Sequence, residues 1–77
     1  SDVCSSDLIE TSGAVYVFEF KRDGTAEDAL SQIDGKGYLI PYSVTKDKNG
    51  NAKRLFKIGV NFDGEKRTLG EWKWTEA

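Results

Sequence analysis

The sequence predicts an α/β fold on a mixed sheet, with elements in the order strand, strand, helix, strand and a short final strand. Residues 14–21 alternate between aromatic side chains and a second set with a period of two, which is the pattern of a β-strand. Residues 25–36 carry apolar side chains at helical spacing, and residues 54–62 return to a strand-like composition. A strand, a helix and a second strand in succession form a β-α-β unit, whose two strands are parallel.

The first two strands are predicted to form a β-hairpin. Residues 8–11, LIET, and residues 14–21 flank Ser12-Gly13, a dipeptide typical of turns. One face of the second strand is wholly aromatic, whereas the other begins with valines and ends with Glu19 and Lys21. The aromatic face is therefore predicted to be a core face. Glu19 and Lys21, at the end of the other face, require a separate explanation.

A helix is predicted after the hairpin. Thr25 has the character of an N-cap, and Asp28 follows three residues later, as in a capping box. Gly35 and Gly37 are predicted to end the helix. One stripe of the helix is apolar, and its members are Ala26, Ala29, Leu30 and Ile33.

The helix is followed by a predicted connection without regular structure. Residues 38–42 lead away from it, and Pro41 forbids its continuation. Residues 43–53 are polar and contain Asn49-Gly50, a dipeptide typical of tight turns.

The last part of the chain is predicted to contain a strand, a turn and a short final strand or coil. Residues 54–62 form the strand that pairs with 14–21, and Asp63-Gly64 turns the chain. Residues 66–77 are predicted to be a short strand or coil, with Trp72 and Trp74 on one face if extended. Packing on an edge strand and the docking of a partner are both open readings for these tryptophans.

Composition excludes several kinds of active site. The chain has no His and a single Cys, Cys4, so Ser-His-Asp catalysis, Cys-His catalysis and a zinc ribbon cannot be built from it. A metal site must use oxygen ligands, which Mg²⁺, Mn²⁺ and Ca²⁺ prefer. No apolar run approaches the length of a membrane span, and a lone Cys is typical of an intracellular chain. We therefore expect a cytoplasmic protein without a membrane segment.

The charge is unevenly distributed along the chain. The net charge is −2, so there is no global attraction to nucleic acid. Residues 1–34 hold eight acids and two bases, whereas residues 35–77 hold five acids and nine bases. The basic region is either a solvated surface or a phosphate-facing flank, and Lys53 and Arg54 are its candidate nucleic-acid contacts.

Glu19 and Lys21 form the candidate catalytic pair. They share a face near the carboxyl end of a central strand, where ligands bind in open α/β sheets. A carboxylate there can bind a divalent cation, and a lysine can act on a water molecule or neutralise a phosphate. This combination suits phosphodiester hydrolysis. The alternative is a solvated ion pair, because Glu-x-Lys is a common spacing.

A longer set of residues resembles one family. VYVFEFKRDGTAEDALSQIDGKGYLIPY followed by KIGVNFDGEKRTLGEW is similar to the nuclease-like domain of the PD-(D/E)XK superfamily that follows an AAA-ATPase-like domain in many bacterial proteins. The resemblance covers residues 9–74. It implies a truncated restriction-endonuclease-like core, nucleic acid as partner, Mg²⁺ or Mn²⁺ as cofactor, and an AAA-ATPase-like domain in the same full-length chain.

The resemblance also implies roles for individual residues. Glu19 matches the metal-binding acid of the family, and Lys21 matches its catalytic lysine. Gln32 corresponds to a glutamine that related nucleases carry on this helix near the site, although a solvated helix residue is an equal reading.

The second metal-binding acid of the family does not match cleanly. The family has an Asp on the preceding strand in a Gly-Arg-x-Asp context, and Asp7, preceded by VCSS, is the nearest candidate. Asp7 is one residue closer to Glu19 than the pattern requires, so the expected position is that of Ser6. With a two-residue turn at Ser12-Gly13, Ser6 faces Glu19 and Asp7 opposes Phe18 on the other face. A longer loop or a bulge would bring Asp7 opposite Glu19 instead.

The first eight residues have a possible non-native origin. The octet SDVCSSDL resembles the translation of a common sequencing adapter. We therefore expect residues 1–8 to be non-native, and residues 9–77 to be a C-terminal fragment of a PD-(D/E)XK nuclease-like domain.

Three functions are compatible with these observations. The first is a fragment of a Mg²⁺-dependent nuclease domain that is inactive or weakly active alone. The second is a non-catalytic module on the same fold that binds nucleic acid or protein. The third is a structural fragment without activity, marginally stable because part of its sheet is exposed.

Overall fold

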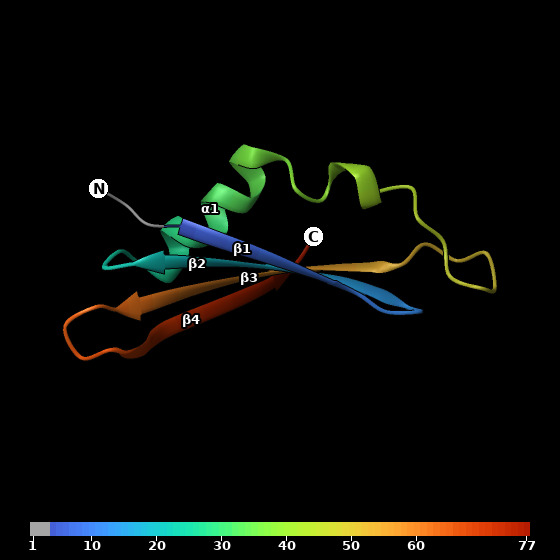
Figure 1. Cartoon of the computed structure of the whole chain (residues 1–77). Helices are drawn as coiled ribbons and strands as arrows, with labels where there is room; N and C mark the ends of the chain where they lie inside the picture. The colour runs from blue at the N-terminus through green and yellow to red at the C-terminus, as the bar shows by residue number, and fades with distance from the viewer. Residues whose placement is uncertain (1–3) are drawn as a thin grey trace.

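The computed structural model describes residues 4–77 and contains one four-stranded sheet with a helix on one face (Figure 1). The strands lie in chain order across the sheet, β1-β2-β3-β4. The α/β class and the mixed sheet predicted from the sequence are confirmed. The elements in chain order are β1 (Cys4–Glu10), β2 (Ala14–Arg22), α1 (Ala26–Lys36), the 3-10 segment η1 (Ile40–Tyr42), β3 (Arg54–Asp63) and β4 (Thr68–Glu76).

The hairpin of β1 and β2 has the register that a two-residue turn predicts. The backbone N–H of Thr11 donates to the carbonyl of Ala14 at 2.8 Å, and the Thr11 hydroxyl accepts from the Ala14 N–H at 3.0 Å. Ser6 pairs with Glu19, and Asp7 pairs with Phe18. β1 is longer than predicted, because residues 4–7 extend its pairing with β2.

Helix α1 begins and ends at recognisable caps. The Thr25 hydroxyl accepts from the Asp28 N–H at 3.0 Å, which confirms the predicted N-cap. The helix ends at Gly37, which takes a left-handed conformation with φ of 67°. The prediction that Gly35 also ends the helix is wrong, since the helix continues through it to Lys36. A single glycine weakens a helix without breaking it.

The core lies between α1 and the two central strands. β2 and β3 pair in parallel, as predicted. Val15 and Val17 of β2 are almost fully buried, as are Ala26, Ala29 and Ile33 of the apolar stripe of α1. Gly59 of β3 allows α1 to approach closely, since a Cβ atom there would lie 2.4 Å from the Ala26 carbonyl oxygen.

The opposite face of the sheet carries no helix (Figure 1), and aromatic side chains contact one another on it. Tyr16 stacks on Phe56 with ring centroids 5.1 Å apart, and Trp74 tilts against Phe56 at 5.9 Å. Trp72 and Trp74 pair with Val60 and Ile58, so their predicted common face is confirmed. Both tryptophans remain more than half exposed. β4 is a full nine-residue strand at the sheet edge, longer than predicted.

The long connection to β3 is organised by one aspartate. The Asp47 carboxylate accepts from the backbone N–H groups of Asn49 and Asn51 at 2.8 and 2.9 Å. Gly50 has φ of 81°, which only glycine adopts at little cost. The tight turn predicted at Asn49-Gly50 is therefore present. Within residues 4–77, no helix has both the length and the apolarity needed to cross a lipid bilayer.

Candidate functional site

Glu19 is a fully buried carboxylate in the C-terminal half of β2. Its relative exposure is 0%, because α1 covers its face of the sheet. The Oε1 atom has no hydrogen-bond partner among the described residues. A buried carboxylate oxygen without a partner carries a large desolvation cost. Such groups often mark functional sites, where the missing partner is an ion, a water molecule or a substrate.

Two small residues flank Glu19 on the neighbouring strands. Ser6 lies opposite it on β1 and Gly59 lies beside it on β3. The flanking position on β3 cannot hold a larger side chain, because α1 packs directly against Gly59. Position 6 is exposed, so a larger side chain can be placed there opposite Glu19.

Lys36 of α1 forms an ion pair with the Glu19 carboxylate. Its Nζ atom donates to Glu19 Oε2 at 3.4 Å, and its side chain is 45% exposed. The Lys36 ammonium also lies 5.6 Å from the centroid of the Tyr38 ring. A side-chain hydrogen bond with Tyr38 raises the pKa of Lys36 above its ordinary value of 10.5, and the charge of Glu19 raises it further.

Lys36 is not among the site residues predicted from the sequence, although the length of the helix indicates that its last turn lies near Glu19. Eleven residues of α1 span about 16 Å, which corresponds to about five residues of a strand. A helix that starts after the end of β2 and folds back over it therefore brings its last turn near Glu19. A basic residue in that last turn is the candidate partner.

Lys21 shares the Glu19 face of β2 and lies two residues nearer the strand end. Its position pairs with Asn61 on β3. The aliphatic stem of Lys21 packs over Gly24, where a Cβ atom would lie 2.7 Å from the Lys21 Cδ and Cε atoms. Glycine at position 24 therefore makes room for this lysine beside the turn that leaves β2.

The remaining predicted metal ligand, Asp7, lies on the aromatic face side of β1. It pairs with Phe18, and its Oδ1 atom accepts from the Leu8 N–H at 2.9 Å. The structure brings Ser6 rather than Asp7 to Glu19. The loop or bulge that would reverse this register does not occur between β1 and β2.

Gln32 is half-buried on α1, next to the buried Ile33. Within residues 4–77, its side chain makes no hydrogen bond that would fix its orientation toward Glu19. The proximity of Gln32 to the carboxylate therefore stays a prediction.

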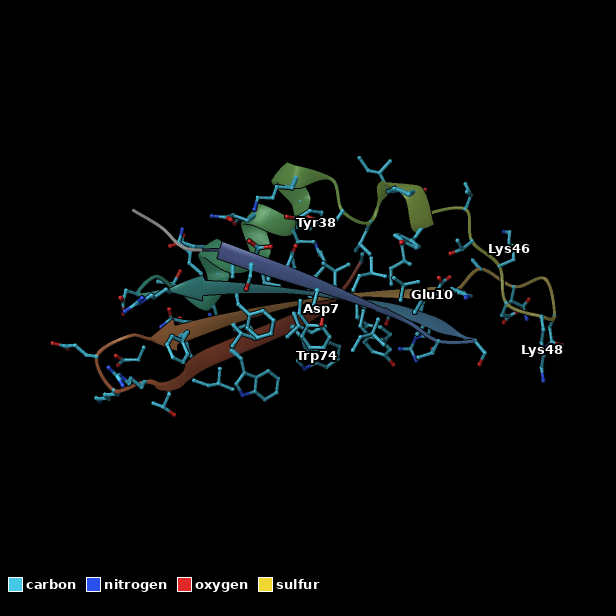
Figure 2. All side chains as sticks on the ribbon, in the orientation of Figure 1. Asp7, Glu10, Tyr38, Lys46, Lys48 and Trp74 are labelled. Atoms are coloured by element: carbon cyan, nitrogen blue, oxygen red, sulfur yellow. The ribbon has the colours of Figure 1, made fainter. Side chains whose placement is uncertain are left out.

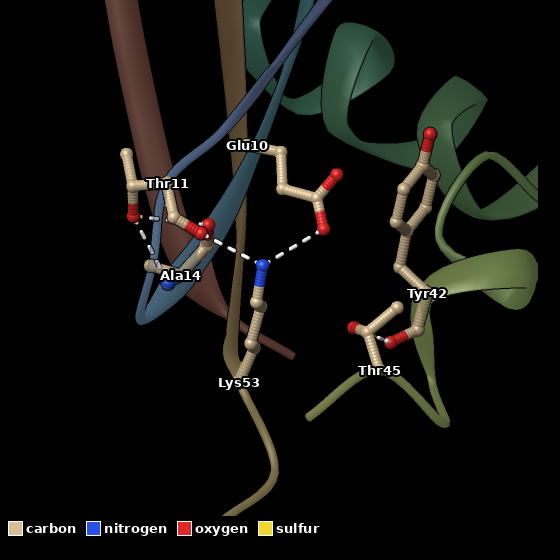
Figure 3. A network of polar contacts seen from close by, with 6 residues as sticks. All are labelled: Glu10, Thr11, Ala14, Tyr42, Thr45 and Lys53. Carbon is tan, nitrogen blue, oxygen red and sulfur yellow. Dashed lines mark hydrogen bonds and ion pairs between the residues drawn. The ribbon is translucent and has the colours of Figure 1, made fainter. Parts of the chain in front are cut away.

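Lys53 and Arg54 lie at the other end of the sheet and are engaged in ion pairs. Lys53 Nζ donates to Glu10 Oε2 at 2.9 Å and to the Thr11 carbonyl at 2.8 Å (Figure 3). Arg54 binds both oxygens of Glu76 at 2.9 and 3.0 Å. Arg54 pairs with Ala14, which is five residues, or about 17 Å, along β2 from Glu19. The structure does not bring these two cations to the candidate site.

Comparison with known families identifies the fold. A family model described as the PD-(D/E)XK nuclease superfamily matches residues 6–72. The chain belongs to the PD-(D/E)XK nuclease superfamily. Its α/β order and mixed sheet fit a truncated core of this superfamily. No curated protein and no solved structure matches the chain.

The residues present do not complete a divalent metal site. Within residues 4–77, no three Asp, Glu, Cys or His side chains converge as a metal-binding group. Glu19 offers one unbonded oxygen, but Mg²⁺ and Mn²⁺ are held by several oxygen ligands, usually including further carboxylates or substrate phosphates. The nearest position for a second carboxylate is occupied by Ser6.

Proposed function

We propose that residues 9–77 are part of a Mg²⁺- or Mn²⁺-dependent nuclease domain that cleaves nucleic acid. The observation that carries this proposal is the buried Glu19 with its unbonded Oε1 atom, in a chain of the PD-(D/E)XK nuclease superfamily. In the full-length protein, an Asp at position 6 would be the second metal ligand, and an AAA-ATPase-like domain would precede the nuclease domain. A divalent ion held there would supply Lewis-acid stabilisation of the scissile phosphate.

The chain's own residues have separate tasks in this proposal. Glu19 is a metal ligand, fixed in orientation because α1 and β3 enclose it. Lys21 lies further along the same face, where its amine would neutralise the phosphate or take a proton from the attacking water. Lys36 donates to the Oε2 atom of Glu19, so the unbonded Oε1 atom is the one that would be offered to a metal ion.

The present chain is expected to have weak nuclease activity or none. It has one carboxylate at the site, and a single carboxylate binds a divalent ion poorly. Cleavage of a labelled oligonucleotide in Mg²⁺ or Mn²⁺ tests the proposal. We expect Ser6→Asp to raise cleavage above the wild-type level and Glu19→Gln to remove that gain. Cleavage by the wild-type chain that survives Glu19→Ala would contradict the assignment of the site.

The ion pairs of Lys53 and Arg54 do not favour nucleic-acid binding at these two residues. Lys53 and Arg54 are both held by carboxylates, and an ion pair that already exists has to be broken before a phosphate can bind. Phosphate binding there would therefore compete with the contacts that hold the hairpin and the end of β4.

A further inference from the structure

A cavity of about 540 Å³ adjoins the candidate nuclease site. It lies between β1 and the connection from α1 to η1, on the helix side of the sheet. Its lining residues include Ser6, Leu8, Lys36, Tyr38, Pro41 and Tyr42. The volume falls within the range typical of small-ligand pockets, roughly 300–1,000 Å³.

The cavity and the candidate site share two side chains. Ser6 is the residue opposite Glu19 on β1, and Lys36 donates to the Glu19 carboxylate. Both residues also line the cavity. A molecule in the cavity would therefore lie next to the position where a phosphodiester is cleaved.

The walls of the cavity combine aromatic, apolar and cationic groups. Tyr38 lies between α1 and β1 (Figure 2), and the Tyr42 side chain extends from η1 on the side of β1 that carries Glu10 (Figure 3). Tyr38 and Tyr42 are only half-buried, so their rings retain free surface. Aromatic rings of this kind are the usual platforms for stacked bases, and a neighbouring lysine is the usual contact for phosphate.

We propose that this cavity receives one unpaired nucleobase of the substrate strand, stacked on Tyr42 or Tyr38, with the adjoining phosphate at Lys36. This proposal rests on the proposed nuclease function, which supplies nucleic acid as the substrate. It adds that the substrate is single-stranded, or has a base displaced from the duplex, beside the cleaved bond. The bases of an intact duplex are stacked inside the helix and reach a pocket of this kind only by flipping out.

The charges around the cavity orient the nucleotide. Lys36 is the one cation among the residues that line it, whereas the Asp7 side chain lies on the opposite, aromatic face of the sheet. The Lys36 side chain donates to Glu19 and is still 45% exposed, so its remaining N–H groups can donate to a phosphate on the side of the cavity nearest Glu19. The base is therefore directed away from Glu19, toward Tyr42 and Pro41.

Binding of a short oligonucleotide that carries 2-aminopurine tests the proposal in the presence of EDTA. The probe is used as a single strand and as a duplex with its complement, against the full chain. We expect the single strand to bind at least about five-fold more tightly than the duplex, with quenching of the 2-aminopurine fluorescence on stacking. Tyr42→Leu combined with Tyr38→Leu should weaken binding at least about five-fold, because stacking on an aromatic ring contributes about that factor per base.

The matched control is Tyr42→Phe combined with Tyr38→Phe, which keeps both rings and should keep binding and quenching. The circular dichroism of each variant verifies that it is folded. Equal affinity for duplex and single strand would overturn the proposal, as would binding by the double leucine variant at the wild-type level, or the absence of any binding by the single strand.

A further variant separates this proposal from the proposed function. Glu19→Leu removes the candidate metal ligand but leaves the cavity walls in place, so it should retain oligonucleotide binding in EDTA. When Glu19→Leu is added to Ser6→Asp, loss of the gained cleavage with retained oligonucleotide binding supports both proposals. A failed gain of cleavage by Ser6→Asp counts against the nuclease site, whereas a failed oligonucleotide titration counts against the cavity.

Discussion

The Lys36 ammonium lies 3.4 Å from the Oε2 atom of a Glu19 carboxylate that is closed to solvent. One end of this ion pair is half exposed, and the other end is buried with its second oxygen unbonded. The pair therefore covers a carboxylate whose hydrogen bonding is incomplete. A residue kept in such an unfavourable state is typical of a functional site, where stability is given up for binding or catalysis.

Glu19→Leu is expected to stabilise the fold. The substitution removes a buried carboxylate oxygen that has no partner, and a buried unsatisfied polar group costs about 1–3 kcal/mol. The partner that remains, Lys36, is half exposed, so water can solvate its ammonium and the loss of the ion pair itself costs little. Urea denaturation at neutral pH should show a higher midpoint with an unchanged slope. A midpoint lower than that of the wild type would show that the carboxylate is stabilising.

Lys36→Met is expected to destabilise the fold, because it leaves the Glu19 charge buried and unpaired. The pKa of Lys36 is raised above 10.5, first by Tyr38 and then by Glu19, so the charged form is stabilised by folding. Its contribution is fully present below pH 10.5 and is lost as the pH rises through the raised pKa. The difference in unfolding midpoint between wild type and Lys36→Met should therefore be constant from pH 7 to pH 9 and shrink in stronger alkali. A difference that grows with pH would contradict the ion pair.

The pair of Arg54 and Glu76 predicts an acid-dependent loss of stability at the other end of the sheet. Hydrogen bonding to Arg54 lowers the pKa of Glu76 below its ordinary value of 4.5. The contribution of this carboxylate is present above pH 4.5 and is lost as the pH falls through the lowered pKa. Glu76→Gln should lower the melting temperature at pH 7 and have a progressively smaller effect below pH 4.5. An effect of equal size at pH 7 and in strong acid would show that the charge of Glu76 plays no part.

Two glycines give a matched test of the packing around the site. Gly59→Ala places a Cβ atom 2.4 Å from the Ala26 carbonyl oxygen and 2.9 Å from the Leu30 nitrogen. Both are backbone atoms, so α1 has to shift, at a cost of about 1–3 kcal/mol. Gly35→Ala meets no atom within 4 Å and lies inside α1, so it should stabilise by about 0.5–1 kcal/mol. Thermal melts of the two variants should move in opposite directions, and a shared direction would contradict the close approach of α1 to β3.

Local sequence signals predict the hairpin and the helix correctly. Ser12-Gly13 is enough to set the register of β1 and β2, because a turn of fixed length determines which residues face each other. Thr25 sets the start of α1 through a hydrogen bond to a residue three positions away. In both cases the interacting groups are close in sequence, so the local residue pattern is enough to predict the structure.

The parts that the sequence does not predict depend on contacts between distant segments. Lys36 and Glu19 are 17 residues apart, and they meet only because α1 folds back over β2. Residues 4–7 have no alternation that would mark a strand, yet they pair with the end of β2. β4 forms a nine-residue strand because β3 pairs with it along most of its length, with an irregularity between Val60 and Phe62. This length cannot be predicted from the sequence of β4 alone.

Binding of Mn²⁺ by Ser6→Asp, measured by isothermal titration calorimetry, tests the central claim most directly. Ser6 faces Glu19, so the new carboxylate should complete a two-acid site and give saturable binding that the wild-type chain lacks. Ser5→Asp is the matched control, since Ser5 pairs with Phe20 and points to the other face of the sheet. Binding by Ser6→Asp that is absent in Ser5→Asp, and that disappears when Glu19→Gln is added, is the predicted result. Equal binding by the two aspartate variants, or no binding by either, would contradict the assignment of Glu19 as a metal ligand of the nuclease site.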